Sequence, residues 1–251
     1  MTLAARRLQR DPKALEELIR TGQVRRAPAL SPREPRPLST GLAALDSALG
    51  GGLSRGQLHE IVAPAGAGGT ALLRACLAAA TQAGELCALI DPADSFDPRQ
   101  PGIDLRRLLW VRPRDAVQAL RSAEIALEAR FALVALDLGD LPRPPARKGV
   151  VQVVRFSFEK RPPAPGASPW ARLARRAEKH AGAVLLLSRA MQAGTFAAAT
   201  VELERGPSRW DGAPGAPARI LRGVHAVSAV ARHKRMPPSG PLPLHFSLEP
   251  L

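Results

Sequence analysis

Short apolar segments alternate with helix-like segments between residues 57 and 188, and this alternation constrains the fold more than any other feature. Five runs have the length and composition of buried strands: residues 57–62, 86–91, 108–112, 131–137 and 183–188. Three helical segments lie among them: residues 71–84, 115–130 and 171–182. Apolar strands separated by helices are typical of a parallel sheet covered on both faces. We therefore predict an α/β fold in which the strand ends, and any binding site, share one edge of the sheet.

The two ends of the chain differ from this central pattern. Residues 1–26 predict a short basic helical arm, which either packs on its own domain or anchors a partner. Residues 27–41 contain four prolines and predict an extended linker, because proline cannot join helical or ladder hydrogen bonds. The core domain is assigned to residues 42–251. Its C-terminal part contains three segments with the pattern of antiparallel strands: residues 199–206, 218–235 and 242–248.

A glycine-rich turn, APAGAGGT at residues 63–70, follows the first predicted strand and precedes the first helix. Such a turn forms an anion cradle, because backbone N–H groups and the helix N-terminus attract negative charge. Active phosphate loops have the pattern G-x-x-x-x-G-K-[ST]. Here Gly68 and Thr70 match, but Ala63 replaces the first glycine and Gly69 replaces the lysine that neutralises the phosphates. The turn is therefore predicted to be a degenerate phosphate loop.

Four segments of the chain resemble the bacterial RecA family, over about residues 38–250. They are LSTGLAALDSALGGGLSRGQLHEI (38–61), LCALIDPADSFDP (86–98), FALVALD (131–137) and ARHKRMPP (231–238). The resemblance implies a RecA-like core: a mostly parallel sheet flanked by helices, with antiparallel C-terminal strands. It places Asp137 at the position of the Mg²⁺-associated aspartate. It also places Lys234 and Arg235 at the basic strand end that reaches a neighbouring subunit's nucleotide in RecA filaments.

The residues that catalyse ATP hydrolysis in the RecA family are missing together. The glutamate that activates water falls on Ala93, and the glutamine that senses the γ-phosphate falls near Arg189. The adenine-stacking tyrosine is absent, because the chain contains no tyrosine. The chain therefore lacks a residue for the general base, for the cation that neutralises the phosphates and for the γ-phosphate sensor. We expect no catalytic residue, no cofactor and no metal. What remains of a nucleotide site is Gly66, Gly68, Gly69, Thr70 and Asp137. Asp137 either retains Mg²⁺ or caps a neighbouring turn.

The segments that contact DNA in RecA also differ. After the sensor strand only AMQAGTFAAA (190–199) remains of a long loop, whereas the region 141–169 is present and basic. Its candidate DNA-binding residues are Arg143, Arg147, Lys148, Arg155, Lys160 and Arg161. Basic residues beside Phe156 and Phe158 could hold phosphates and stack bases. The alternative is a strand with buried phenylalanines followed by a solvated loop.

A shortened RecA-like core with a degenerate phosphate loop most resembles the ImuA family. That family accompanies ImuB, a polymerase-like protein, and an error-prone C-family DNA polymerase in damage-induced mutagenesis. The resemblance implies a non-catalytic accessory protein of translesion synthesis that binds an ImuB-like partner, the C-family polymerase, RecA or DNA. Two alternatives stay open. One is a divergent ATPase that uses Thr70, Asp137 and a residue donated in trans, and the other is a cell-division inhibitor like SulA.

Composition and single residues indicate which partners, cellular location and metal sites to expect. The formal net charge of +14 favours contact with polyanions, although five lysines against thirty-one arginines also reflect a GC-rich genome. No apolar run is long enough to cross a bilayer and no signal peptide is visible, so we expect a cytoplasmic protein without a membrane segment. Cys76 and Cys87 are expected to be reduced core thiols. The five histidines lack ligand spacing, and Asp91, Asp94 and Asp97 are expected to cap a loop rather than bind a cation.

Overall fold

The protein is described from a computed structural model that covers residues 36–139, 168–213, 215 and 219–247. All of them belong to one compact unit, which begins at Arg36. Its elements are α3 (Ala43–Ala48), β1 (Leu58–Val62), α4 (Gly69–Gln82), β2 (Cys87–Ile90), η1 (Leu105–Arg107), β3 (Leu108–Val111), α5 (Ala116–Glu128), β4 (Leu133–Asp137), α6 (Pro169–His180), β5 (Ala183–Ser188), η2 (Gly194–Phe196), β6 (Ala197–Asp211), β7 (Ile220–His233) and β8 (Leu242–Ser247).

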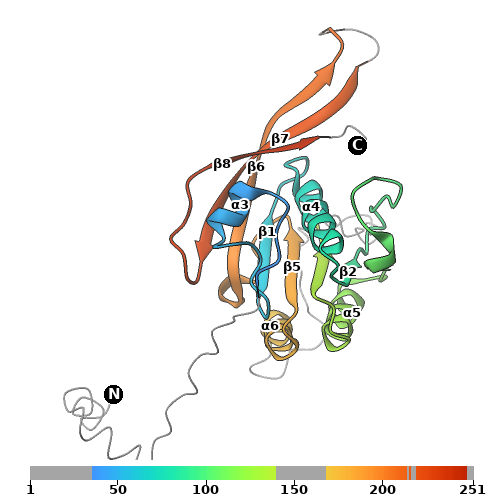
Figure 1. Cartoon of the computed structure of the whole chain (residues 1–251), viewed down its shortest axis with the longest axis vertical. Coiled ribbons are helices and arrows are strands. Elements are labelled where there is room, and N and C mark those ends of the chain that lie inside the picture. Colours follow the sequence, from blue (N-terminus) through green and yellow to red (C-terminus); the bar gives the residue numbers. More distant parts are fainter. Residues whose placement is uncertain (1–35, 140–167, 214, 216–218, 248–251) are drawn as a thin grey trace, which may run out of the picture. The chain divides into compact units, whose positions relative to one another are not determined.

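The strands form one mixed sheet with the order β3-β2-β4-β5-β1-β6-β7-β8 (Figure 1). Every pair from β3 to β6 is parallel, and β6, β7 and β8 pair antiparallel. The predicted fold class, a mostly parallel sheet with antiparallel C-terminal strands, is therefore confirmed. Parallel pairing brings the carboxyl ends of β1, β4 and β5 to the same edge, where the glycine-rich turn follows β1.

Two apolar clusters lie on opposite faces of the sheet, because alternate residues of a strand point to opposite sides. On β1, Ile61 packs into the cluster that includes Leu72 and Leu77 of α4. Leu58 packs into the other cluster, which includes Leu120 of α5 and Leu173 of α6. Helices thus cover both faces of the parallel part of the sheet, as the continuous apolar strands require.

Helix α5 begins after Asp115, whose carboxylate accepts a hydrogen bond from the Gln118 amide at 2.8 Å. Of the large apolar residues at helical spacing in this segment, Leu120 and Leu127 are buried, whereas Val117 and Ile125 are exposed. The buried face is completed by the alanines at positions 119, 123 and 126. Small residues suit this face because they let the helix approach the sheet closely.

The N-terminal edge of the unit is tied down by Asp46. Its carboxylate accepts hydrogen bonds from the Ser39 hydroxyl at 2.6 Å and from the Thr40 hydroxyl at 2.6 Å. Leu38 is buried and pairs with Leu53 through a short antiparallel bridge. Packed core residues therefore precede the assigned domain start at residue 42. The predicted helical arm, residues 1–26, falls outside the part of the chain that the structure describes.

Candidate nucleotide site

The phosphate turn, residues 63–68, connects β1 to α4 at the carboxyl edge of the sheet. Gly66 and Gly68 have φ of 74° and 87°, a left-handed conformation that L side chains rarely adopt. Ala67, within the turn, is fully buried. The helix begins at Gly69, two residues before the predicted start at residue 71, so both Gly69 and Thr70 lie in its first turn.

The position of the missing lysine has no room for a side chain. A β-carbon at position 69 would lie 2.6 Å from Cβ of Ala63 and 2.7 Å from Cδ1 of Leu187 on β5. Real β-carbon contacts are longer, and the Ala63 methyl cannot rotate away. The two departures from the phosphate-loop pattern are therefore coupled: the methyl of Ala63 occupies space that a lysine at position 69 would need.

The C-terminal strands also pack against the turn. A β-carbon at position 68 would lie 3.0 Å from Cε2 of Phe246 on β8 and 3.5 Å from Cβ of Ala226 on β7. Phe246 is buried and belongs to the same apolar cluster as Ala67 and Leu187. The chain's own aromatic ring thus closes the side of the turn that faces β8.

One cation near the turn was missed by sequence reasoning. Nη1 of Arg205, an exposed residue on β6, would lie 4.0 Å from a β-carbon at position 66. The signal that could have found it is strand register. Val62 at the end of β1 pairs with Glu202, so β6 continues alongside the turn and reaches Arg205 three residues later.

Asp137 lies at the end of β4 and is almost fully buried. One carboxylate oxygen accepts a hydrogen bond from the Gly139 amide at 3.0 Å, which is the turn-capping role considered for it. Arg189, at the end of β5, donates from Nε to the Gly139 carbonyl at 2.8 Å. These two residues therefore both bind the backbone of the segment that follows β4.

The aspartates after β2 are held by local hydrogen bonds. Asp91 is buried and accepts from the Phe96 amide at 2.9 Å and from Nε1 of Trp110 at 3.3 Å. Asp97 accepts from Nε of Arg99 at 3.0 Å, and this hydrogen bond lowers the pKa of the Asp97 carboxyl. Ala93, at the position of the catalytic glutamate, offers no acid or base. Within the described ranges, no group of three or more metal-ligating side chains occurs.

The basic residues proposed to act between subunits lie at the opposite edge of the sheet. The Lys234 amide donates to the carbonyl of Ala198 at 2.8 Å, beside the amino end of β1. Arg235 is exposed in the same turn, where its amide donates to Nδ1 of His233 at 3.0 Å. Within one chain they are therefore separated from the phosphate turn by the length of β1. The six candidate DNA-binding residues between 143 and 161 are not among the described residues.

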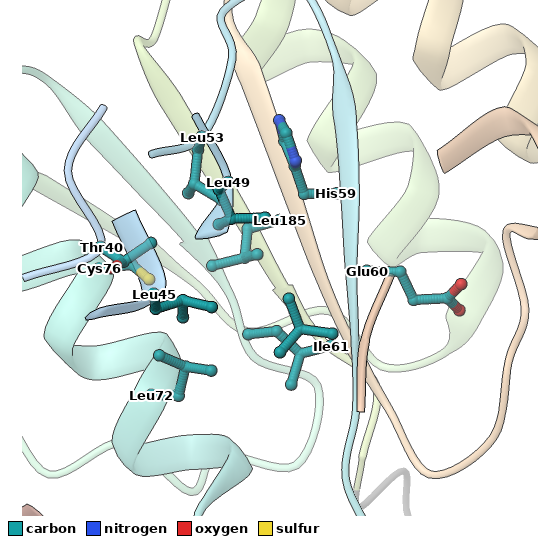
Figure 2. A pocket seen from close by; sticks show the side chains of 11 residues that line it. Thr40, Leu45, Leu49, Leu53, His59, Glu60, Ile61, Leu72, Cys76 and Leu185 are labelled. Carbon is teal, nitrogen blue, oxygen red and sulfur yellow. The ribbon is translucent and has the colours of Figure 1, made fainter. Parts of the chain in front are cut away.

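A cavity of about 10 Å³ lies on the α3 and α4 side of β1. It is lined mainly by leucines, including Leu45, Leu53 and Leu72, and Figure 2 shows Glu60 pointing to the other side of the strand. A cavity of this volume has room for about one water molecule, which is far smaller than a nucleotide. Burial lowers the pKa of His59, which lines it, to about 4. Burial also raises the pKa of Cys87 to about 12, and both cysteines are buried thiols.

A mixed sheet with a glycine-rich turn after its central strand defines a RecA-like α/β protein. Residues 16–137 of the chain match the RecA N-terminal domain family. The RecA protein of Chlorobaculum tepidum is 43% identical over 91 residues, covering 35% of this chain and 26% of that protein. The RecA protein of Deinococcus radiodurans is 35% identical over 119 residues, covering 46% of this chain and 33% of that protein. The aligned part thus spans about a quarter to a third of these curated relatives.

The fold is also similar to a solved structure, that of the RadB recombinase. The TM-score is 0.57 at 21% sequence identity, and the match covers 84% of this chain and 96% of the RadB chain. At this identity the likeness concerns the fold alone. No helix built from the described residues is both long enough and apolar enough to span a bilayer.

Proposed function

We propose that this chain is a non-catalytic accessory protein of damage-induced mutagenesis, similar to the ImuA family. The observation that carries the proposal is the contact between positions 63 and 69. Glycine stands where ATPases of this pattern have lysine, and the Ala63 methyl and Leu187 fill the space beside it. A turn packed in this way has no side chain of its own to neutralise a transferring phosphate.

The rest of the nucleotide site supports the same proposal. Ala93 supplies no general base, and Arg189 stands in place of the sensing glutamine and donates from Nε to the Gly139 carbonyl. Asp137 engages the amide of the same glycine. Both side chains thus bind the backbone at Gly139, which supports a structural role for them.

The partners follow from the resemblance to ImuA. We propose that the chain binds an ImuB-like polymerase homologue, and through it or directly an error-prone C-family DNA polymerase and RecA, in the cytoplasm. The net charge of +14 supports an additional, sequence-independent attraction to DNA. No cofactor or metal is part of the proposal.

The proposal is tested with the purified full-length chain. Phosphate release from ATP is measured with and without single-stranded DNA, and the affinity for a purified ImuB-like protein from the same genome is measured with and without ATP. We expect no phosphate release above the protein-free blank, and a partner affinity that ATP does not change. Phosphate release that Thr70→Ala or Asp137→Ala abolishes would contradict the proposal.

A second candidate function, nucleotide binding by a divergent site, is favoured by the position of Arg205. Its guanidinium lies beside Gly66 and could take over part of the charge of the missing lysine. Isothermal titration with a non-hydrolysable ATP analogue separates the two candidates. Micromolar affinity that Arg205→Gln removes and Arg209→Gln retains would favour this second function, because Arg209 lies farther along the same strand.

A further inference from the structure

Strands β6 and β7 continue beyond the strands that flank them. β6 pairs with β1 only as far as Glu202, and β8 pairs with β7 only from Gly223 onward. Among the residues that the structure describes, no strand therefore pairs with the far end of the hairpin on either side, and Figure 1 shows it extending past the rest of the sheet. We call residues 209–211 and 219–222 the hairpin arm.

The two faces of the hairpin arm carry different side chains. Trp210 is opposite Leu221 and Asp211 is opposite Ile220, and directly opposite residues share a face. One face shows Trp210 with the guanidinium carbon of Arg219 5.4 Å from its ring centre. The other face shows Ile220 and an ion pair between Arg222 and Asp211.

Two large apolar side chains are exposed on this arm. Trp210 is 44% exposed and Ile220 is 58% exposed. A two-stranded hairpin has no second layer to cover such residues and is marginally stable alone in water. Burial of this apolar surface against a partner removes it from water, which favours association. Tryptophan and arginine are also the residue types that dominate binding energy at protein interfaces.

We infer that the hairpin arm is a docking site for an acidic, partly apolar surface of a protein partner, an inference that rests on the proposed function. The arm carries three arginines against one aspartate, so electrostatic complementarity favours an acidic partner. A second copy of the chain is disfavoured, because each copy has a net charge of +14.

A nucleic acid fits the same arm less well than a protein does. Arg219 covers one face of the Trp210 ring, which a base would otherwise stack on. Ile220, on the opposite face, offers no ring for a base to stack on. An aliphatic and aromatic surface rimmed by arginines is instead typical of a protein interface.

The test uses the full-length chain and the purified ImuB-like protein. Trp210→Ala and Ile220→Ser are each expected to raise the dissociation constant at least ten-fold. Arg219→Glu is expected to do the same and to reduce the salt dependence of binding. Val117→Ser is the matched control, because it also removes an exposed apolar side chain, on α5, and should leave the affinity unchanged. Thermal melting of each variant confirms folding, and Arg219→Glu carries the test if an apolar variant melts early.

The outcomes separate the inference from the proposed function. If the unmodified chain binds the partner and all arm variants bind equally well, the inference is overturned and the proposed function stands. If the unmodified chain binds no polymerase-like protein, both are overturned. If the arm variants keep partner affinity but lose affinity for a fluorescent single-stranded DNA probe, the arm is a nucleic-acid element and the inference is wrong.

Discussion

At the scale of single residues, the methyl group of Ala63 determines what position 69 can hold. Gly69→Lys alone places a β-carbon against Ala63 and Leu187, and overpacking of this kind costs about 1–3 kcal/mol of stability. We predict that the effect of Ala63→Gly on the free energy of unfolding has opposite signs in the unmodified protein and in the Gly69→Lys variant. It should destabilise the unmodified protein, where a buried methyl is lost, and stabilise the Gly69→Lys variant, where a clash is relieved.

Urea unfolding of the unmodified chain, of Ala63→Gly, of Gly69→Lys and of the double variant measures the coupling between positions 63 and 69. Ala65→Gly in the same turn is the control, because Ala65 is exposed and should show no dependence on residue 69. A loss of stability from Ala63→Gly in both backgrounds would contradict the steric explanation. If the steric explanation holds, ATP binding by a restored lysine must be tested in the chain that carries both Ala63→Gly and Gly69→Lys.

His59 makes stability depend on pH. Burial lowers its pKa from 6.5 to about 4, while Nε2 lies 3.1 Å from the Ser54 carbonyl. Above pH 6.5 the ring is neutral in both folded and unfolded chains. As the pH falls from 6.5 toward 4, the unfolded chain binds the proton first, so stability falls by as much as about 3 kcal/mol.

The measurement is urea unfolding at pH 7 and pH 4.5. His59→Gln should show a smaller loss of stability between these two values than the unmodified chain does. His225→Gln is the control and should keep the full loss, because His225 is only partly buried, on β7. Equal pH dependence in the unmodified chain and in His59→Gln would rule out His59 as the source.

At the scale of elements, Glu60 on β1 fastens the crossover between β5 and β6. The carboxylate is fully buried and one oxygen accepts hydrogen bonds from the amides of Gln192 at 2.6 Å and Ala193 at 3.1 Å. We predict that Glu60→Ala costs about 3 kcal/mol, because the two buried amides lose their acceptor. Glu60→Gln should cost less, since an amide oxygen can still accept.

Hydrogen exchange localises this effect. In Glu60→Ala the amides of Gln192 and Ala193 should exchange faster, while those of α5 should keep their protection, and Glu60→Gln should give a smaller change. Glu202→Ala, an exposed glutamate on β6, is the control and should change neither stability nor exchange. Unchanged protection of the crossover in Glu60→Ala would show that the hydrogen bonds contribute little to it.

Elements were predictable where the pattern of large apolar residues reflects burial on both faces. The strand at 183–188 has the predicted limits, because every residue in it is buried. On α5 the pattern was less informative, since Val117 and Ile125 are exposed and alanines complete the buried face. Ala63, Gly69 and Asp137 could be found from motifs. Contacts of Arg205 and Phe246 with the phosphate turn could not, because they depend on register between strands distant in sequence.

At the scale of the whole molecule, the net positive charge and the hairpin arm are expected to bind different partners. The excess of fourteen positive charges is spread over many arginines, so it attracts polyanions without selecting a sequence. The hairpin arm, in contrast, combines charge with apolar area and can select one protein. The two kinds of binding should therefore respond differently to salt.

We predict that single-stranded DNA binds the full-length chain weakly and with steep salt dependence. For contact with roughly four phosphates, the affinity should fall by about fifty-fold between 50 and 200 mM salt, because each contact releases condensed counterions. Fluorescence anisotropy with oligonucleotides of different sequence measures this, and the slopes should agree. Affinity for the ImuB-like partner should fall less over the same range, since burial of apolar surface is insensitive to screening. DNA binding that resists salt or prefers one sequence would instead indicate a specific nucleic-acid site, for which the basic residues between 141 and 169 are the first candidates.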